Sequence, residues 1–204
     1  MNRITFFIDG FNLFHSIDSN PEYHKYKWLN LKKLAEKFIT KNDIIKDIYY
    51  FTALATWSLD KSNRHKLYIK ALELMSGIKV IYGKFKKKDI TCRLCHKKYQ
   101  TYEEKQTDVN IAIYLLEFAF KDEYDTAVII TGDSDLIPSI KSVSSIFPSK
   151  SIWLIIPIGR DAKELTNCCD KHMKIKEKHL KTSLFPEEII INDTTKLICP
   201  PKWK

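Results

Sequence analysis

The sequence predicts an α/β domain of Rossmann-like type, with a central, mostly parallel β-sheet flanked by helices. Short apolar runs with little polar alternation are typical of strands that are buried on both faces. Stretches with helical periodicity lie between these runs, and this alternation favours parallel pairing through right-handed crossovers. The length of 204 residues fits one domain with at most a small insertion or tail.

The expected elements are defined by their apolar patterns. Strands rich in β-branched and aromatic residues are expected at Ile4–Ile8, Ile48–Thr52, Ile78–Tyr82, Ala127–Thr131 and Ile152–Ile156. Helices are expected at Leu29–Ile39, Lys61–Met75, Val109–Phe120 and Leu136–Phe147. Ligands of such sheets bind beyond the carboxyl ends of the strands, so a functional site is expected among the residues that follow each run.

The stretch 84–103 is predicted to be an inserted loop, because its Lys, Thr and Gln residues break the apolar pattern. It contains a CxxC pair, Cys92 and Cys95, followed directly by His96. Two thiolates at this spacing supply half of a structural zinc site. The missing ligands would come from His96, from a distant histidine such as His65, or from a second subunit in a homodimer. The alternative is a pair of reduced thiols, since an odd total of five Cys argues against a disulfide framework.

The main domain is expected to span residues 1–185, and residues 186–204 are expected to form a docked or frayed tail with an edge strand at Ile189–Ile191. The first apolar segment stops at Asp9. This segment is too short for a signal-peptide core or a membrane span. A cytoplasmic location is therefore expected.

The net charge of +9 is concentrated in two segments. Residues 84–105 carry eight basic and three acidic residues, and residues 171–181 carry five Lys and one Glu. A solvated surface is one interpretation of such runs. The other is a polyanionic partner, RNA or DNA. A membrane partner is not indicated, because the sequence lacks a basic amphipathic helix and a lipidation motif.

Carboxylates follow two of the expected strands. Asp9 comes after the first strand, and Asp133 and Asp135 come after the fourth. Asp108 begins the expected helix 109–120, just after Thr107, which can cap that helix. Each could be a capping or turn residue. Gathered at one sheet edge, however, they would repel one another unless Mg²⁺ or Mn²⁺ neutralised them, and such a metal site suits phosphodiester hydrolysis.

Three blocks of sequence carry a family resemblance. They are FIDGFNL at Phe7–Leu13, EKQTDVNIA at Glu104–Ala112 and YDTAVIITGDSDLIP at Tyr124–Pro138. In this order they resemble the signature blocks of the NYN domain family. The proteins of this family are LabA-like members of the PIN-like nuclease superfamily. Pro157–Arg160, with Leu165 and Asp170, resembles the closing block of that family.

The resemblance implies a PIN-like three-layer fold and metal-dependent cleavage of RNA. It places Asp9, Asp108, Asp133 and Asp135 on the acidic, metal-binding positions, and Asn12 on the polar position beside the first aspartate. Asn12 would orient the scissile phosphate or a water, or it would serve a turn. Lys105 would offset charge near the cluster, or it would be a surface neighbour of Glu104.

The basic insertion suits nucleic-acid binding, because cations bind phosphates and aromatic rings stack on unpaired bases. Its candidate contact residues are Lys84, Lys86, Lys87, Lys88, Arg93, Lys97, Lys98 and Tyr99. Aromatic stacking favours single strands.

The sequence therefore predicts a metal-dependent endoribonuclease. One alternative is an RNA-binding or regulatory protein with a weakly active or inactive metal site. A phosphohydrolase of small molecules is disfavoured, because Asp9 is not part of a DxD motif and the chain has no Walker-type loop.

Overall fold

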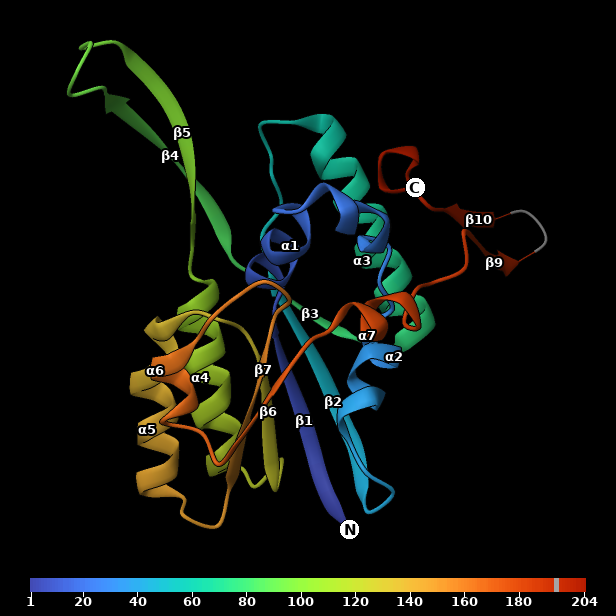
Figure 1. The fold of residues 1–204 in the computed structure, drawn as a ribbon, viewed down its shortest axis with the longest axis vertical. Helices are drawn as coiled ribbons and strands as arrows, with labels where there is room; N and C mark the ends of the chain where they lie inside the picture. Colours follow the sequence, from blue (N-terminus) through green and yellow to red (C-terminus); the bar gives the residue numbers. More distant parts are fainter. Residues whose placement is uncertain (193–194) are drawn as a thin grey trace.

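The computed structural model describes residues 1–192 and 195–204 and has three layers, with helices on both faces of a central sheet (Figure 1). Among these residues the main sheet has six strands in the order β3-β2-β1-β6-β7-β8, and all of its pairings are parallel. The strands are β1 (Asn2–Asp9), β2 (Asp43–Thr52), β3 (Lys79–Tyr82), β6 (Thr126–Ile130), β7 (Ser151–Ile156) and β8 (Lys171–Lys174). The predicted fold class is confirmed, and each of the five expected runs overlaps a strand.

The helices divide between the two faces of the sheet. They are α1 (Gly10–Asp18), α2 (Leu31–Ala35), α3 (Leu59–Ser76), α4 (Thr107–Phe120), α5 (Ile137–Ile146), α6 (Lys163–Thr166) and α7 (Glu177–Lys181). Figure 1 shows α1, α2, α3 and α7 on one face and α4, α5 and α6 on the other. The four expected helices are present, although 29–39 forms only the short α2 and a 3₁₀ turn at Glu36–Phe38. Helices α1, α6 and α7 and strand β8 are additional.

Two apolar cores separate the layers. Along β1, Ile4, Phe6 and Ile8 belong to the core under α1, α2 and α3, whereas Phe7 belongs to the core under α4 and α5. Successive side chains of a strand point to opposite faces, so a strand covered on both sides must be apolar at nearly every position. This double burial explains the unbroken apolar runs in the sequence.

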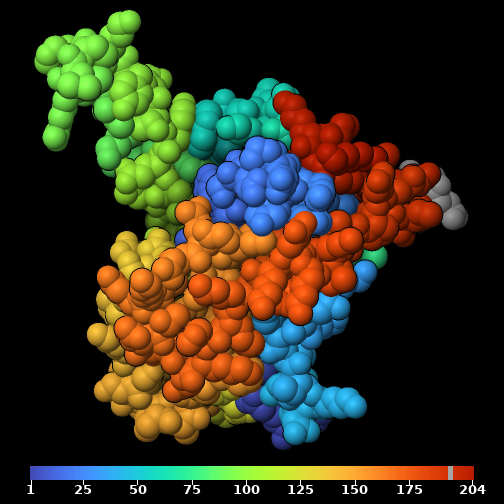
Figure 2. Space-filling view, in the orientation of Figure 1, coloured from blue at the N-terminus to red at the C-terminus, as the bar shows by residue number. Residues whose placement is uncertain are grey.

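The prediction that the basic insertion is a loop was wrong. It is an antiparallel hairpin of β4 (Lys84–Thr91) and β5 (Lys98–Lys105), which stands away from the body of the protein (Figures 1 and 2). Most of its side chains are exposed on both faces. Apolar alternation marks only strands with one buried face, so this hairpin lacks the expected signal.

The C-terminal segment docks on the domain. The strand expected at Ile189–Ile191 is present as β9 (Glu188–Asn192), but it pairs with β10 (Thr195–Ile198) in a separate two-stranded sheet. The edge strands of the main sheet are β3 and β8. Trp203 is 9% exposed and contacts the rings of Trp28 and Tyr68. None of the helices among the described residues is long and apolar enough to cross a membrane.

Gly10 allows α1 to start directly on the sheet. A Cβ at this position would lie 2.6 Å from both the Phe51 carbonyl oxygen and the Tyr50 ring. We predict that Gly10→Ala displaces α1 and lowers the free energy of unfolding by about 1–3 kcal/mol, measured by urea denaturation. Gly77→Asn is the control, because Gly77 has a φ of 62° with open space around it and Asn tolerates that conformation. Equal losses in both variants would contradict the close-approach explanation.

Candidate functional site

Asp9 ends β1 at the carboxyl edge of the sheet and caps α1. Its Oδ1 accepts a hydrogen bond from the Asn12 backbone N–H at 3.0 Å, and its Oδ2 accepts one from the Thr131 hydroxyl at 2.8 Å. Asp9 is only 4% exposed. This burial, together with the charges of Asp133 and Glu104, raises the pKa of its carboxyl to about 6. The two hydrogen bonds act in the opposite direction and lower the pKa. Asp9 is therefore both a helix cap and a buried acid at the candidate site.

Two polar side chains attach the loop after β6 to the start of α1. Thr131 Oγ1, which donates to Asp9, also accepts the Asp133 backbone N–H at 3.1 Å. The Asn12 side-chain oxygen accepts the Gly132 backbone N–H at 3.0 Å. Asn12 thus serves the local structure through its oxygen. Within the described residues its NH₂ group has no protein partner, which leaves it free to donate elsewhere.

Asp108 approaches the same edge from α4. Thr107 is the first residue of α4 and does not cap it, contrary to expectation; the cap position belongs to Gln106, whose φ is 80°. Glu104 serves the helix start instead, because its carboxylate accepts hydrogen bonds from the Thr107 backbone N–H at 3.2 Å and from the Thr107 hydroxyl. This arrangement puts Asp108 in the first turn and brings a further carboxylate, Glu104, close to the site.

Three aspartates form a carboxylate cluster. One oxygen each from Asp108, Asp133 and Asp135 lies within 4.8 Å of the others. Asp9 is adjacent to this cluster but is not one of the three. Burial, together with the charges of four acidic neighbours, raises the pKa of Asp108 to about 6. These neighbours are Asp9, Asp133, Glu104 and Asp135. All of the charged neighbours that shift this pKa are acidic, so the site is strongly anionic.

The donor set fits a divalent cation. Carboxylate oxygens are the ligands that Mg²⁺ and Mn²⁺ prefer, and three of them leave coordination positions for water and phosphate. Lys105 does not neutralise the cluster, because its Nζ lies 2.9 Å from Glu103 in the hairpin. Arg160 lies beside the loop at Gly132. A Cβ added to Gly132 would lie 3.5 Å from the Cβ of Arg160.

The basic hairpin presents different residues on its two faces, since residues paired across an antiparallel ladder share a face. One face carries Lys84, Lys86, Lys88, Tyr99, Glu103 and Lys105, and the other carries Phe85, Lys87, Lys98, Tyr102 and Glu104. Lys88 and Lys105 form ion pairs with Glu103. Lys86 and Lys87 are exposed and have no ion-pair partner among the described residues. Arg93 and Lys97 lie at the exposed hairpin tip.

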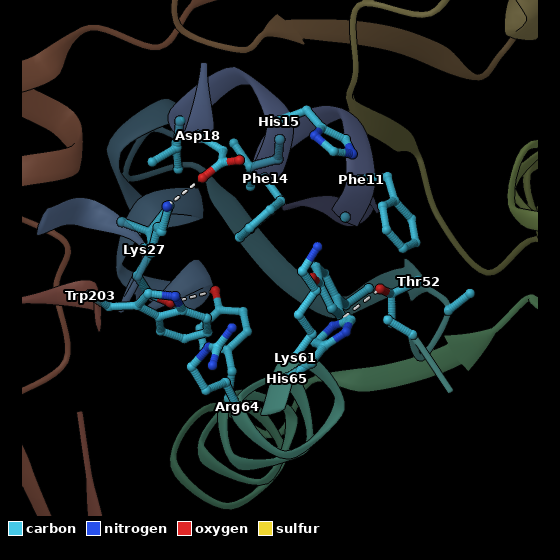
Figure 3. Close-up of a pocket in the computed structure, with 18 of the residues that line it drawn as sticks. Phe11, Phe14, His15, Asp18, Lys27, Thr52, Lys61, Arg64, His65 and Trp203 are labelled. Atoms are coloured by element: carbon cyan, nitrogen blue, oxygen red, sulfur yellow. Dashed lines mark hydrogen bonds and ion pairs between the residues drawn. The ribbon is translucent and has the colours of Figure 1, made fainter. Parts of the chain in front are cut away.

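Cys92 and Cys95 are free thiols at the hairpin tip. Hydrogen bonds from the backbone N–H groups of Cys95 and Leu94, and from the Cys95 side chain, lower the pKa of the Cys92 thiol. His96 follows in a left-handed conformation with a φ of 54°. His65 lies in α3, near the base of the hairpin (Figure 3). Within the described part of the chain, the three-aspartate cluster is the one group found with three potential metal ligands.

The structure also contains a cavity that the sequence pattern did not predict. This cavity of about 500 Å³ lies between α1, α3 and the base of the hairpin, with aromatic and basic side chains in its wall (Figure 3). Its lining comes from positions between Gly10 and Trp203, so no local motif marks it. Glu104 also lies at the site without being one of the predicted site residues. Its position three residues before Thr107 is the signal that could have identified it as a helix-start acceptor.

Known proteins resemble this chain in sequence and in fold. A protein of Pseudomonas putida, named 6-hydroxy-3-succinoylpyridine 3-monooxygenase HspA, is 25% identical over 217 residues, covering 88% of this chain and 67% of that protein. A crystal structure of VPA0982, a protein of unknown function from Vibrio parahaemolyticus, superposes with a TM-score of 0.60. Its sequence identity is 14%, and the match covers 90% of this chain and 96% of the other. That structural likeness supports the fold.

The family model described as the NYN domain matches residues 3–176. This range contains all three signature blocks and the whole carboxylate cluster. The chain belongs to the NYN domain family, which is of the PIN-like nuclease type.

Proposed function

We propose that this protein is a metal-dependent endoribonuclease that hydrolyses phosphodiester bonds of single-stranded RNA. The observation that carries the proposal is the cluster of Asp108, Asp133 and Asp135 at the carboxyl edge of an NYN domain. These residues would hold Mg²⁺ or Mn²⁺, with Asp9 beside them. A bound divalent cation would activate a water and stabilise the charge that develops on the phosphate.

The surrounding residues keep this site in position. The hydroxyl of Thr131 holds Asp9 and the backbone of Asp133 in one hydrogen-bonded chain. The oxygen of Asn12 is held by Gly132, so its NH₂ group is a neutral donor for a phosphate oxygen. A neutral donor suits this site, because a further carboxylate would repel the substrate.

The hairpin extends this site with a cationic surface. Lys86, Lys87 and the tip residues Arg93 and Lys97 would bind phosphates of the strand, and Tyr99 would stack on a base. Phosphate contacts do not distinguish RNA from DNA, so a DNA strand belongs in every assay.

Two alternatives remain distinct from this proposal. An RNA-binding or regulatory protein would retain the cluster without turnover. Oxidation of a substituted pyridine, the activity for which the Pseudomonas putida relative is named, would use the aromatic cavity in place of the carboxylate cluster.

We predict that Asp133→Asn lowers RNA cleavage by about 100-fold or more, because it removes charge and a ligand from the cluster. Cleavage of a labelled single-stranded RNA is measured with Mg²⁺, with Mn²⁺ and with EDTA, and a DNA strand of the same sequence runs in parallel. Asp89→Asn is the matched control, since Asp89 is exposed in the hairpin. If wild type binds RNA but yields no metal-dependent product, the regulatory alternative is favoured.

We predict that Asp108→Asn stabilises the metal-free protein at pH 7 by about 1 kcal/mol, a value reduced for solvent screening. The raised pKa means that the folded protein binds this proton more tightly than the unfolded chain. The free energy of unfolding of wild type therefore falls as the pH rises from about 4 to about 6, and the cost is fully present at pH 7.

Thermal unfolding in EDTA at pH 4 and pH 7 measures this effect, and the difference between the proteins should disappear at pH 4. Mn²⁺ should then raise the midpoint of wild type and of Asp89→Asn, but not that of Asp108→Asn. An equal Mn²⁺ shift in all three proteins would disprove the assignment of Asp108 to the metal site.

We predict that Lys86→Gln with Lys87→Gln weakens RNA binding and lowers the slope of log K against log salt by about 1.4, the value for two contacts to a single strand. Binding is measured in the Asp133→Asn background, where the RNA stays intact. Lys66→Gln with Lys70→Gln removes the same charge from an exposed part of α3 and is the control. An unchanged slope in the hairpin variant would show that these lysines are only solvated.

A further inference from the structure

The cavity beside α1 has one strongly aromatic wall at the base of the hairpin. The rings of Trp57 and Tyr102 are stacked, with centroids 3.8 Å apart and an interplanar angle of 4°. Phe85 packs edge-on against Trp57 at 4.6 Å, and Phe11 packs edge-on against Phe85 at 5.2 Å. Trp57 is 39% exposed, so its ring is not fully covered by the protein. Such a wall suits a planar ring.

The cavity lining also contains cationic side chains. Lys61 and Arg64 of α3 line the cavity (Figure 3), and neither has an ion-pair partner among the described residues. Lys27 is different, because it pairs with Asp18, the one carboxylate in the described lining. Lys202 also lines the cavity and has no ion-pair partner in the described part of the chain. These three unpaired cations give the cavity an excess of positive charge, which favours an anionic ligand.

The cavity also contains a neutral polar pair. Thr52 Oγ1 and His65 Nε2 lie 3.2 Å apart, and burial lowers the pKa of His65 to about 4. The imidazole is therefore uncharged at neutral pH. Within the described residues its other ring nitrogen has no protein partner, so it can bond the polar edge of a ligand.

We propose that this cavity binds one nucleotide of the RNA strand. The base stacks against the wall of Trp57, its polar edge meets His65, and its phosphate contacts Lys61 and Arg64. The volume of about 500 Å³ lies in the range of ordinary small-ligand sites. Gly10 and Phe11, which line the cavity, directly follow Asp9, so the bound nucleotide is a neighbour of the one cleaved. The inference rests on the proposed function for the identity of the strand.

Isothermal titration calorimetry in EDTA tests the proposal with uridine monophosphate and adenosine monophosphate as probes. Ribose 5-phosphate, which lacks the base, should bind at least tenfold more weakly than the better nucleotide. Lys61→Gln with Arg64→Gln should weaken nucleotide binding at least tenfold, whereas Lys66→Gln with Lys70→Gln, on the same helix, should not change it. Equal binding of ribose 5-phosphate, or an unchanged affinity in the cavity variant, would overturn the proposal.

Two further arms separate this inference from the nuclease. Asp133→Asn should bind the nucleotide as wild type does, because the cavity lies outside the carboxylate cluster. Nucleotide binding without any metal-dependent cleavage would disprove the proposed nuclease function and support the nucleotide site. Cleavage without nucleotide binding would support the nuclease function and disprove the nucleotide site. Pyridine-3-carboxylate, a planar ring with an acid group, is the competing probe. Tighter binding of this probe than of either nucleotide would assign the cavity to a small molecule and overturn the RNA assignment.

Discussion

The candidate site depends on the parallel pairing of β1 with β6. The register places Ile8 opposite Ile130. Asp9, the last residue of β1, and Thr131, the residue after β6, therefore lie at the same sheet edge. The hydroxyl of Thr131 can then bond the carboxylate of Asp9 and the backbone of Asp133 together. Without this pairing, the start of α1 and the acidic loop would not meet.

The same constraint creates an electrostatic cost. It gathers Asp9, Glu104, Asp108, Asp133 and Asp135 where the acidic neighbours raise the pKa values of Asp9 and Asp108. Such repulsion makes the site suited to binding a cation from solution. Asp9 and Asp133 also cap helices, which shows that a structural role and membership of the site are compatible.

The hairpin connects the two candidate surfaces of the molecule. Its lysines are exposed. Phe85 packs with Phe11, and Tyr102 packs with Trp57, at the cavity. Glu104, near the end of β5, helps to start α4 and so positions Asp108. The hairpin therefore borders both the carboxylate cluster and the aromatic cavity. An RNA strand bound along the hairpin would pass from the cavity to the cluster.

The sequence by itself determined the α/β class, the buried strands and the aspartates at their ends, because double burial leaves continuous apolar runs and parallel strands end at one edge. It did not reveal the hairpin, whose two exposed faces need no apolar pattern, or the true cap of α4. Only the tertiary structure separated Asp9 from the three-aspartate cluster and assembled the cavity from residues as distant as Phe11, Arg64, Tyr102 and Trp203. Distances between side chains on different elements depend on tertiary packing, and no local sequence pattern predicts that packing.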